Sequence, residues 1–225
     1  MYEQEWSGET PYRKNIVNDK NNKKAYYKIT DFPKMLIFEE NFSLIQKEFL
    51  NLIDNPETDK GFFEPWCEKD LYEDSNPTGW LVAPLIINCN TVENKIKKVP
   101  FLENLLKRTK GIITASFSCL MPNTWIVPHK GYENYSEKVL RYHIGLKIPK
   151  GDLGLRVHKI QTKWVEGKSI IFDDSLIHEA WNYSDDKRYV LIIDFLRSDD
   201  IDFNITELPD LMLTDQARTY MKLKK

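Results

Sequence analysis

The hydrophobic positions before residue 110 recur at helical spacing. FSLIQKEFLNLI places four apolar side chains on one face of a helix. These four residues are Phe42, Ile45, Phe49 and Ile53. TVENKIKKVPFLENLLKRTKG predicts two short helices, because Pro100 suits the first turn of the second helix and Gly111 follows a basic last turn. Residues 54–80 are rich in Pro and Gly, which favours a long ordered loop.

From residue 111 onwards the pattern changes to short runs rich in β-branched and aromatic residues, separated by Pro, Gly, Asn and Asp. The runs are IITASFSCLM, TWIVP, VLRYHIGLKIP, LGLRVHK, KSIIFDD and RYVLIIDFL. WVEGKS, between two of them, predicts a hairpin turn. This succession predicts an antiparallel barrel or a double-sheet jelly roll. We therefore expect a mainly β protein with a helical flank.

The chain of 225 residues suits a single domain. We divide it into four parts: an N-terminal arm (1–34), a helical and loop flank (35–110), a jelly-roll core (111–198) and a C-terminal extension (199–225). The extension is predicted to contain a helix or two half-turns.

Composition narrows the class of protein. Hydrophobic residues make up 41% of the chain, enough for a core and against disorder. A net charge of −2 and a pI of about 6.1 argue against nucleic acid or an anionic membrane as a partner. No apolar run reaches the roughly 18 residues of a membrane span. The absence of a signal-peptide core and three scattered cysteines favour a reducing, cytoplasmic location.

The histidines suggest a metal site. All four lie in the β region, and His129 and His178 fall on different predicted strands. Two imidazoles that converge at the mouth of a small barrel suit iron or zinc. A single strand histidine is more often an ordinary hydrogen-bonded residue, so other features have to support this interpretation.

Cationic and hydroxyl side chains supply that support. A guanidinium at Arg188 on the last strand suits a carboxylate. Arg141 and His143 are two positions apart, which places both on one face of a strand. Ser118 adds a hydroxyl donor. Two separate anion sites beside a two-histidine metal site match 2-oxoglutarate, with its distal carboxylate at Arg188 and Ser118 and its keto-acid end near Arg141 and His143.

Each of these residues also has an ordinary interpretation. Arg188 is compatible with a surface position on an edge strand, and Arg141 with an ion pair to Glu137 or to an Asp across the sheet. Ser118 is compatible with a hydroxyl bonded to the backbone, and FDDS with simple turn acids. Five aromatic residues are candidates for the cavity wall or for ordinary core. They are Trp125, Tyr142, Trp164, Phe172 and Trp181.

Several segments, in order, resemble the aspartyl/asparaginyl β-hydroxylase family of iron(II)- and 2-oxoglutarate-dependent oxygenases. The segments are GWLVAPLI, SFSCLMPNTWIVPHKG, LRYHIGLKIP and WVEGKSIIFDDSLIHEAWNYSDDKRYVLIIDF. The resemblance implies a double-stranded β-helix, a cupin-like member of the jelly-roll class. It implies that His129 and His178 bind Fe(II), that Arg188 and Ser118 hold the distal carboxylate of 2-oxoglutarate, and that Arg141 and His143 hold its other end.

The resemblance also implies roles for neighbouring residues. Asp173 or Asp174 would orient a ring N–H of His178 or the adjoining turn, and Trp181 would wall the cavity. In VPHKG, Gly131 occupies the position where many non-haem iron enzymes carry the carboxylate of His-x-Asp. Animal members of the family resemble this chain in having glycine there, so a two-histidine site is expected, with Glu133 as a further candidate ligand.

The activity implied is O2-dependent hydroxylation of an unactivated C–H bond in an amino acid, a peptide or another small molecule. The family's animal members carry Arg-x-Arg-x-His where this chain has VLRYH, so Val139 replaces an arginine associated with the substrate carboxylate. Three alternatives stay open: a halogenase that seats halide at the vacant carboxylate position, a non-catalytic 2-oxoglutarate-binding module and, more remotely, a zinc hydrolase. The sequence does not predict an oligomeric state.

Overall fold

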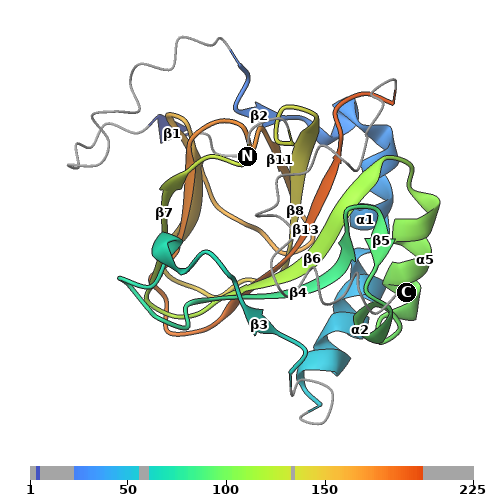
Figure 1. Cartoon of the computed structure of the whole chain (residues 1–225), viewed down its shortest axis with the longest axis horizontal. Coiled ribbons are helices and arrows are strands. Elements are labelled where there is room, and N and C mark those ends of the chain that lie inside the picture. The colour runs from blue at the N-terminus through green and yellow to red at the C-terminus, as the bar shows by residue number, and fades with distance from the viewer. Residues whose placement is uncertain (1–3, 6–22, 56–60, 133–134, 200–225) are drawn as a thin grey trace.

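The computed structural model describes residues 4–5, 23–55, 61–132 and 135–199. The predicted C-terminal helix and the candidate ligand Glu133 lie outside this part of the chain. Two antiparallel sheets face each other, and helices cover the outer side of the larger one (Figure 1). None of the helices in the described residues is long and apolar enough to cross a membrane.

The larger sheet has eight strands. In spatial order they are β2 (Tyr26–Tyr27), β11 (Ser169–Phe172), β8 (Val139–Lys147), β13 (Arg188–Leu196), β6 (Ile112–Leu120), β4 (Trp80–Ile87) and β3 (Glu64–Pro65), with β5 (Asn90–Thr91) paired to β4. The smaller sheet has five strands. They are β1 (Gln4–Glu5), β10 (Ile160–Thr162), β9 (Leu153–Val157), β12 (His178–Asn182) and β7 (Thr124–His129).

The strand order identifies the core as a double-stranded β-helix. From β6 to β13 the chain alternates between the sheets, so that β6, β8, β11 and β13 lie in the larger sheet and β7, β9, β10 and β12 in the smaller. The predicted jelly roll is therefore confirmed. The predicted WVEGKS hairpin is wrong: the turn is present, with Gly167 at φ +72°, but it carries the chain from β10 in one sheet to β11 in the other.

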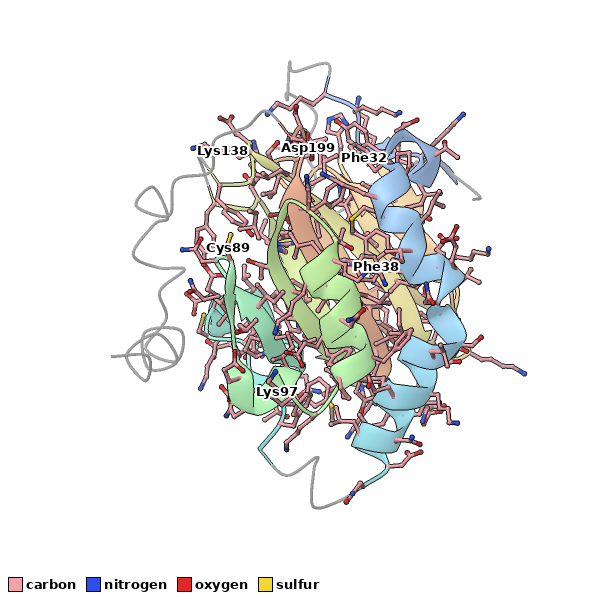
Figure 2. All side chains as sticks on the ribbon, turned by 90° about the vertical axis from the view of Figure 1, so that its right-hand side faces the viewer. Phe32, Phe38, Cys89, Lys97, Lys138 and Asp199 are labelled. Carbon is pink, nitrogen blue, oxygen red and sulfur yellow. The ribbon has the colours of Figure 1, made fainter. Side chains whose placement is uncertain are left out.

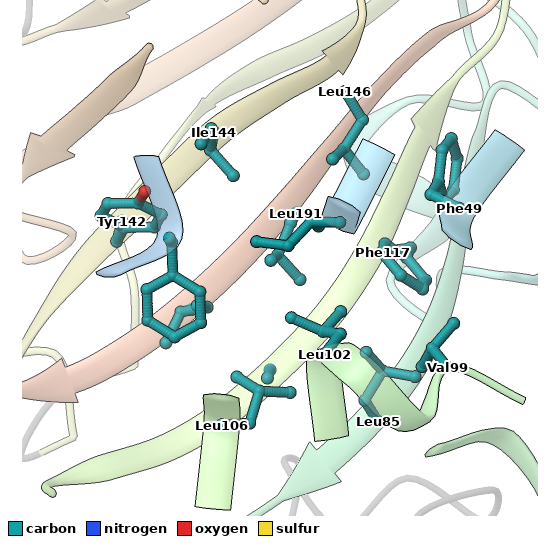
Figure 3. Close-up of a cluster of buried hydrophobic side chains, with 14 of the residues drawn as sticks. Phe49, Leu85, Val99, Leu102, Leu106, Phe117, Tyr142, Ile144, Leu146 and Leu191 are labelled. Carbon is teal, nitrogen blue, oxygen red and sulfur yellow. The ribbon is translucent and has the colours of Figure 1, made fainter. Parts of the chain in front are cut away.

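The helical flank packs against the outer face of the larger sheet (Figure 2). Its helices are η2 (Ile29–Asp31), η3 (Pro33–Met35), α1 (Leu36–Glu40), α2 (Phe42–Ile53), α4 (Glu93–Ile96) and α5 (Pro100–Arg108). The short helix η4 (Lys69–Leu71) lies instead against β7 of the smaller sheet. The predicted helices at α2 and α5 are confirmed. Phe49 of α2 meets Phe117 of β6 with ring centroids 4.8 Å apart, within the main hydrophobic cluster (Figure 3).

The larger sheet divides its side chains between two environments, because successive residues point to opposite faces. Leu191 pairs with Phe117 of β6, and both belong to the cluster under the helices. Arg188 pairs with Leu120, which pairs in turn with Trp80 of β4. Arg188 and Trp80 face the smaller sheet and line the space between the sheets. The apolar face therefore stabilises the fold and leaves the inner face for chemistry.

Residues 23–27 form part of this barrel. β2 pairs with β11 at the edge of the larger sheet. The Tyr26 hydroxyl donates toward the carbonyl oxygens of Leu155 and Ile160, 3.3 and 3.2 Å away in the smaller sheet. Tyr26 thus closes one end of the gap between the sheets. The sequence predicts an arm for residues 1–34 and does not indicate this contact.

Candidate active site

His129 and His178 lie side by side on paired strands of the smaller sheet. They are register partners on β7 and β12, and their ring centroids are 4.2 Å apart. Each Nδ1 lies 2.8 Å from a backbone carbonyl oxygen, that of Val127 for His129 and that of Leu176 for His178. A carbonyl only accepts, so each Nδ1 carries the proton and each Nε2 keeps a free lone pair.

Both rings are neutral at physiological pH. Burial lowers the pKa of His129 to about 3, with a further contribution from His178. Burial likewise lowers the pKa of His178 to about 3. Neutral imidazoles with a free Nε2 are the form that binds Fe(II) or Zn(II). Among the residues that the structure describes, no three His, Cys, Asp or Glu side chains form a metal-binding group, so the histidines stand as a pair.

A buried carboxylate occupies the space beside Gly131. A Cβ at position 131 would lie 1.9 Å from Oδ2 of Asp174, so only glycine fits there. The Gly131 N–H donates to the Asp174 carbonyl oxygen at 2.8 Å. Asp174 is 1% exposed, and its Oδ1 lies 3.3 Å from Nε2 of His178. The carboxyl group that the sequence lacks at position 131 is thus supplied from position 174.

This arrangement selects one of the roles expected for Asp173 and Asp174. Asp174 does not meet the ring N–H of His178, because that Nδ1 is held by Leu176. Asp174 lies instead on the Nε2 side, where a metal would bind. Asp173 does order the turn, since it accepts hydrogen bonds from the Ser175 N–H at 3.0 Å and the Ser175 hydroxyl at 2.6 Å.

Substituting Gly131 by alanine tests this packing. We expect the Cβ to displace the Asp174 carboxylate, lower the free energy of unfolding by about 1–3 kcal/mol and weaken divalent-metal binding. Thermal unfolding and Mn(II) titration would measure both effects, with the adjacent exposed substitution Lys130→Ala as control. Unchanged values for both would show that Asp174 does not fill this space.

Arg188 is a buried cation without a complete set of partners. It is 2% exposed, and Nε and Nη1 have no hydrogen-bond acceptor among the described residues. The guanidinium carbon lies 4.6 Å from the centroid of the Trp164 ring. Burial lowers the pKa of Arg188 to about 10, so the group is still charged at neutral pH. An unpaired buried guanidinium is costly, and this one faces a cavity where an anion would satisfy it.

Ser118 and His143 add donors to the same wall. Ser118 Oγ accepts a hydrogen bond from Trp80 Nε1 at 3.0 Å, which leaves its own proton free to donate. His143 Nδ1 accepts from Trp164 Nε1 at 3.2 Å, because an indole N–H only donates. His143 is therefore protonated on Nε2, a buried donor with no acceptor in the part of the chain that the structure describes. Burial holds the pKa of His143 well below its usual range, so the ring is neutral.

Arg141 reaches the cavity but is already paired. Its Nε and Nη2 donate to the two carboxylate oxygens of Asp194, at 2.8 and 2.9 Å, and its Nη1 lies 2.6 Å from Asp174 Oδ1. Asp194 is the register partner of Arg141 on β13, so the ion pair with an Asp across the sheet is the arrangement found. Burial lowers the pKa of Arg141, but the two carboxylates outweigh it and raise the pKa. Arg141 thus holds Oδ1 of Asp174, whereas Oδ2 lies against Gly131.

These residues surround one small, partly open cavity. Its lining contains all six predicted site residues, Ser118, His129, Arg141, His143, His178 and Arg188, together with Trp80, Ile126, Leu155, Trp164, Phe172, Ala180 and Ile192. The expected role of Trp181 as a cavity wall is wrong: its ring packs on Gly154 and its Nε1 donates to Asp152 at 3.0 Å. Tyr142 packs under the helices against Phe38, and Trp125 donates to Glu179.

Two contributors to the site are not predicted from the sequence: Trp80 and the position of Asp174 beside Nε2 of His178. The Trp80 signal was present in GWLVAPLI, because Trp80 begins a strand, but its contact with Ser118 depends on how β4 pairs with β6. FDDS marked Asp174 as a turn residue without showing which way it points.

Comparison with known protein families shows the family of this chain. The aspartyl/asparaginyl beta-hydroxylase family matches residues 39–198. The chain belongs to this family. Within it, the chain is 36% identical over 130 residues to an ornithine lipid ester-linked acyl 2-hydroxylase of Rhizobium tropici, covering 57% of this chain and 45% of that protein. It is 34% identical over 161 residues to the human aspartyl/asparaginyl beta-hydroxylase, covering 69% of this chain and 20% of that protein.

This family member therefore spans less than half the length of these two curated relatives. Among solved structures, it is similar to a Pseudomonas putida prolyl-4-hydroxylase, with 13% identity, a TM-score of 0.47, and coverage of 69% of this chain and 87% of that one.

Proposed function

We propose that this chain is an Fe(II)- and 2-oxoglutarate-dependent oxygenase that uses O2 to hydroxylate an unactivated C–H bond. The observation that carries the proposal is Arg188, a buried guanidinium with two unpartnered nitrogens facing the same cavity as the free Nε2 atoms of His129 and His178. A metal bound to the two Nε2 atoms and a ligand carboxylate bound to Arg188 would give all of these groups a partner. Family membership supports the reaction class.

The residues present fit both groups. His129 and His178 would hold iron through Nε2, with the Asp174 carboxylate adding negative charge beside it. Arg188 and the Ser118 hydroxyl would bind the distal carboxylate of 2-oxoglutarate. His143 would donate its Nε2 proton to the other end, and Arg141, held by two aspartates, would keep positive charge nearby. When bound, iron would activate O2, with 2-oxoglutarate oxidised to succinate and CO2, and so supply the oxidising power toward the substrate C–H bond.

The chain itself supplies orientation and a dry site. Backbone carbonyls fix both histidine rings, and Arg141 fixes Asp174. Apolar side chains line the rest of the cavity and exclude water from it. Tyr26 packs on Phe172, with ring centroids 6.5 Å apart, and seals the wall behind His143 and His178.

The substrate class is an amino acid, a peptide or another small molecule, and the relatives named above add lipid acyl chains to the candidates. Val139 bears on this choice. It is fully buried in an apolar cluster with Ile113, Tyr135 and Leu196. Because no cation stands at position 139, a substrate carboxylate has no partner there, which favours a substrate other than an aspartyl side chain.

Asp174 also bears on halogenation. A halide beside Gly131 would share a buried space with the Asp174 carboxylate, and two adjacent buried anions repel. This favours hydroxylation over the halogenase alternative. The unpaired donors of Arg188 and His143 favour binding of 2-oxoglutarate both by an enzyme and by a non-catalytic binding module. A catalytic test therefore distinguishes these two functions.

Anaerobic addition of Fe(II) and 2-oxoglutarate tests the proposal. We expect a visible charge-transfer absorbance band only when both are present, because the keto acid must chelate the metal to produce it. Succinate release after O2 is admitted, with pools of candidate metabolites, peptides and lipids, then tests turnover. A band without any succinate would support the non-catalytic binding module instead. The absence of a band would contradict both the oxygenase and the binding module.

A further inference from the structure

Arg197, one residue after β13, joins the two segments that flank the histidines. Its Nη1 donates to Asp173 Oδ2 at 3.0 Å, and its Nη2 donates to Asp173 Oδ1 at 2.5 Å. The same Nη2 donates to the Ser136 carbonyl oxygen at 2.9 Å, and the Arg197 N–H donates to that of Lys138 at 3.1 Å. Asp173 lies in the turn before His178, whereas Ser136 and Lys138 follow His129. One side chain therefore bridges both segments.

The bridge surrounds the space that holds the Asp174 carboxylate. Ser136 lines one side of that space, since its Cβ lies 2.9 Å from the position of a Cβ on Gly131. Asp173, the neighbour of Asp174 in the chain, has a side chain that is 1% exposed. A buried carboxylate of this kind depends on its cation. Without Arg197, the negative charge of the Asp173 carboxylate would lack its cation next to a second buried carboxylate. The turn would then have to rearrange.

We propose that Arg197 is a positioning residue that keeps the Asp174 carboxylate beside Nε2 of His178 by holding Asp173 and the 135–138 segment together. The inference rests on the proposed function, because it takes the Asp174 carboxylate beside His178 to contribute to metal binding. Arg197 does not line the cavity, so it acts through Asp174 and not on the ligand.

A double-mutant cycle with Mn(II) as the probe tests the inference on the apo full-length chain. We expect Arg197→Ala to raise the Kd for Mn(II) by roughly 10–100-fold, the range found when groups that orient metal ligands are removed. Arg197→Lys should recover part of the loss, because an ammonium keeps the charge but not the two-pronged contact. In an Asp174→Asn background, Arg197→Ala should change the Kd little further.

Lys34→Ala is the matched control. Lys34 is similarly exposed, 24% against 22% for Arg197, and it pairs with Asp199 near the same end of β13. Its removal should leave the Kd unchanged. If Arg197→Ala weakened Mn(II) binding equally in both backgrounds, or not at all, the inference would be wrong. If Arg197→Ala did not fold, the same cycle with Arg197→Lys would decide.

His178→Ala separates this inference from the proposed function. Loss of Mn(II) binding in His178→Ala together with wild-type binding in Arg197→Ala would overturn only the role of Arg197. Unchanged Mn(II) binding in His178→Ala would overturn the metal site itself.

Discussion

His178→Ala is expected to abolish succinate release and to weaken divalent-metal binding by more than about 100-fold. Removing a group that only orients a metal ligand typically lowers metal affinity by about 10–100-fold. His178 would itself be one of only two imidazole ligands, so its removal should lower the affinity further. The side chain is 5% exposed and is the register partner of His129 across the sheet. Isothermal titration with Mn(II) and a succinate assay would measure the two effects.

His158→Ala is the control for this experiment. His158 is also a histidine of the smaller sheet, in the turn between β9 and β10, but it does not line the cavity. We expect it to retain metal binding and turnover. Circular dichroism should show both variants folded. Retention of metal-dependent turnover in folded His178→Ala would contradict the metal assignment.

The features predicted correctly from sequence are those set by strand periodicity. Arg141 and His143 share a face because they are two residues apart on β8, and both line the cavity. Arg188 and Ser118 approach each other because β13 pairs with β6, with Leu120 opposite Arg188 and Ser118 opposite Val190. A period of two fixes such a face without further information.

The missed features depend on contacts between segments that no local pattern encodes. Asp174 reaches the Nε2 side of His178 only because Gly131 lets its loop approach the 173–175 turn. WVEGKS has the turn chemistry that was expected, but strand pairing made it a crossing between sheets. Likewise, the sequence left the partner of Arg141 open, and the register with β13 selected Asp194.

Arg188→Ala is expected to raise the Kd for 2-oxoglutarate by roughly 30-fold or more, because truncating one partner of a buried charge pair costs about 2–5 kcal/mol. Arg188→Lys should lose less, since a point charge remains but the planar fork does not. Titration of the Fe(II) protein with 2-oxoglutarate under anaerobic conditions would give both values. Lys187→Ala, the neighbouring exposed substitution, serves as control.

Arg188→Met separates a ligand-binding role from a structural one. Methionine has a similar reach without charge, so it removes a buried, incompletely paired cation from the apo protein. We therefore expect Arg188→Met to raise the thermal unfolding temperature of the apo chain while it weakens 2-oxoglutarate binding as much as Arg188→Ala. Ordinary core residues show the opposite sign, because their loss destabilises the fold. Unchanged affinity for 2-oxoglutarate in these variants would show that Arg188 does not bind it.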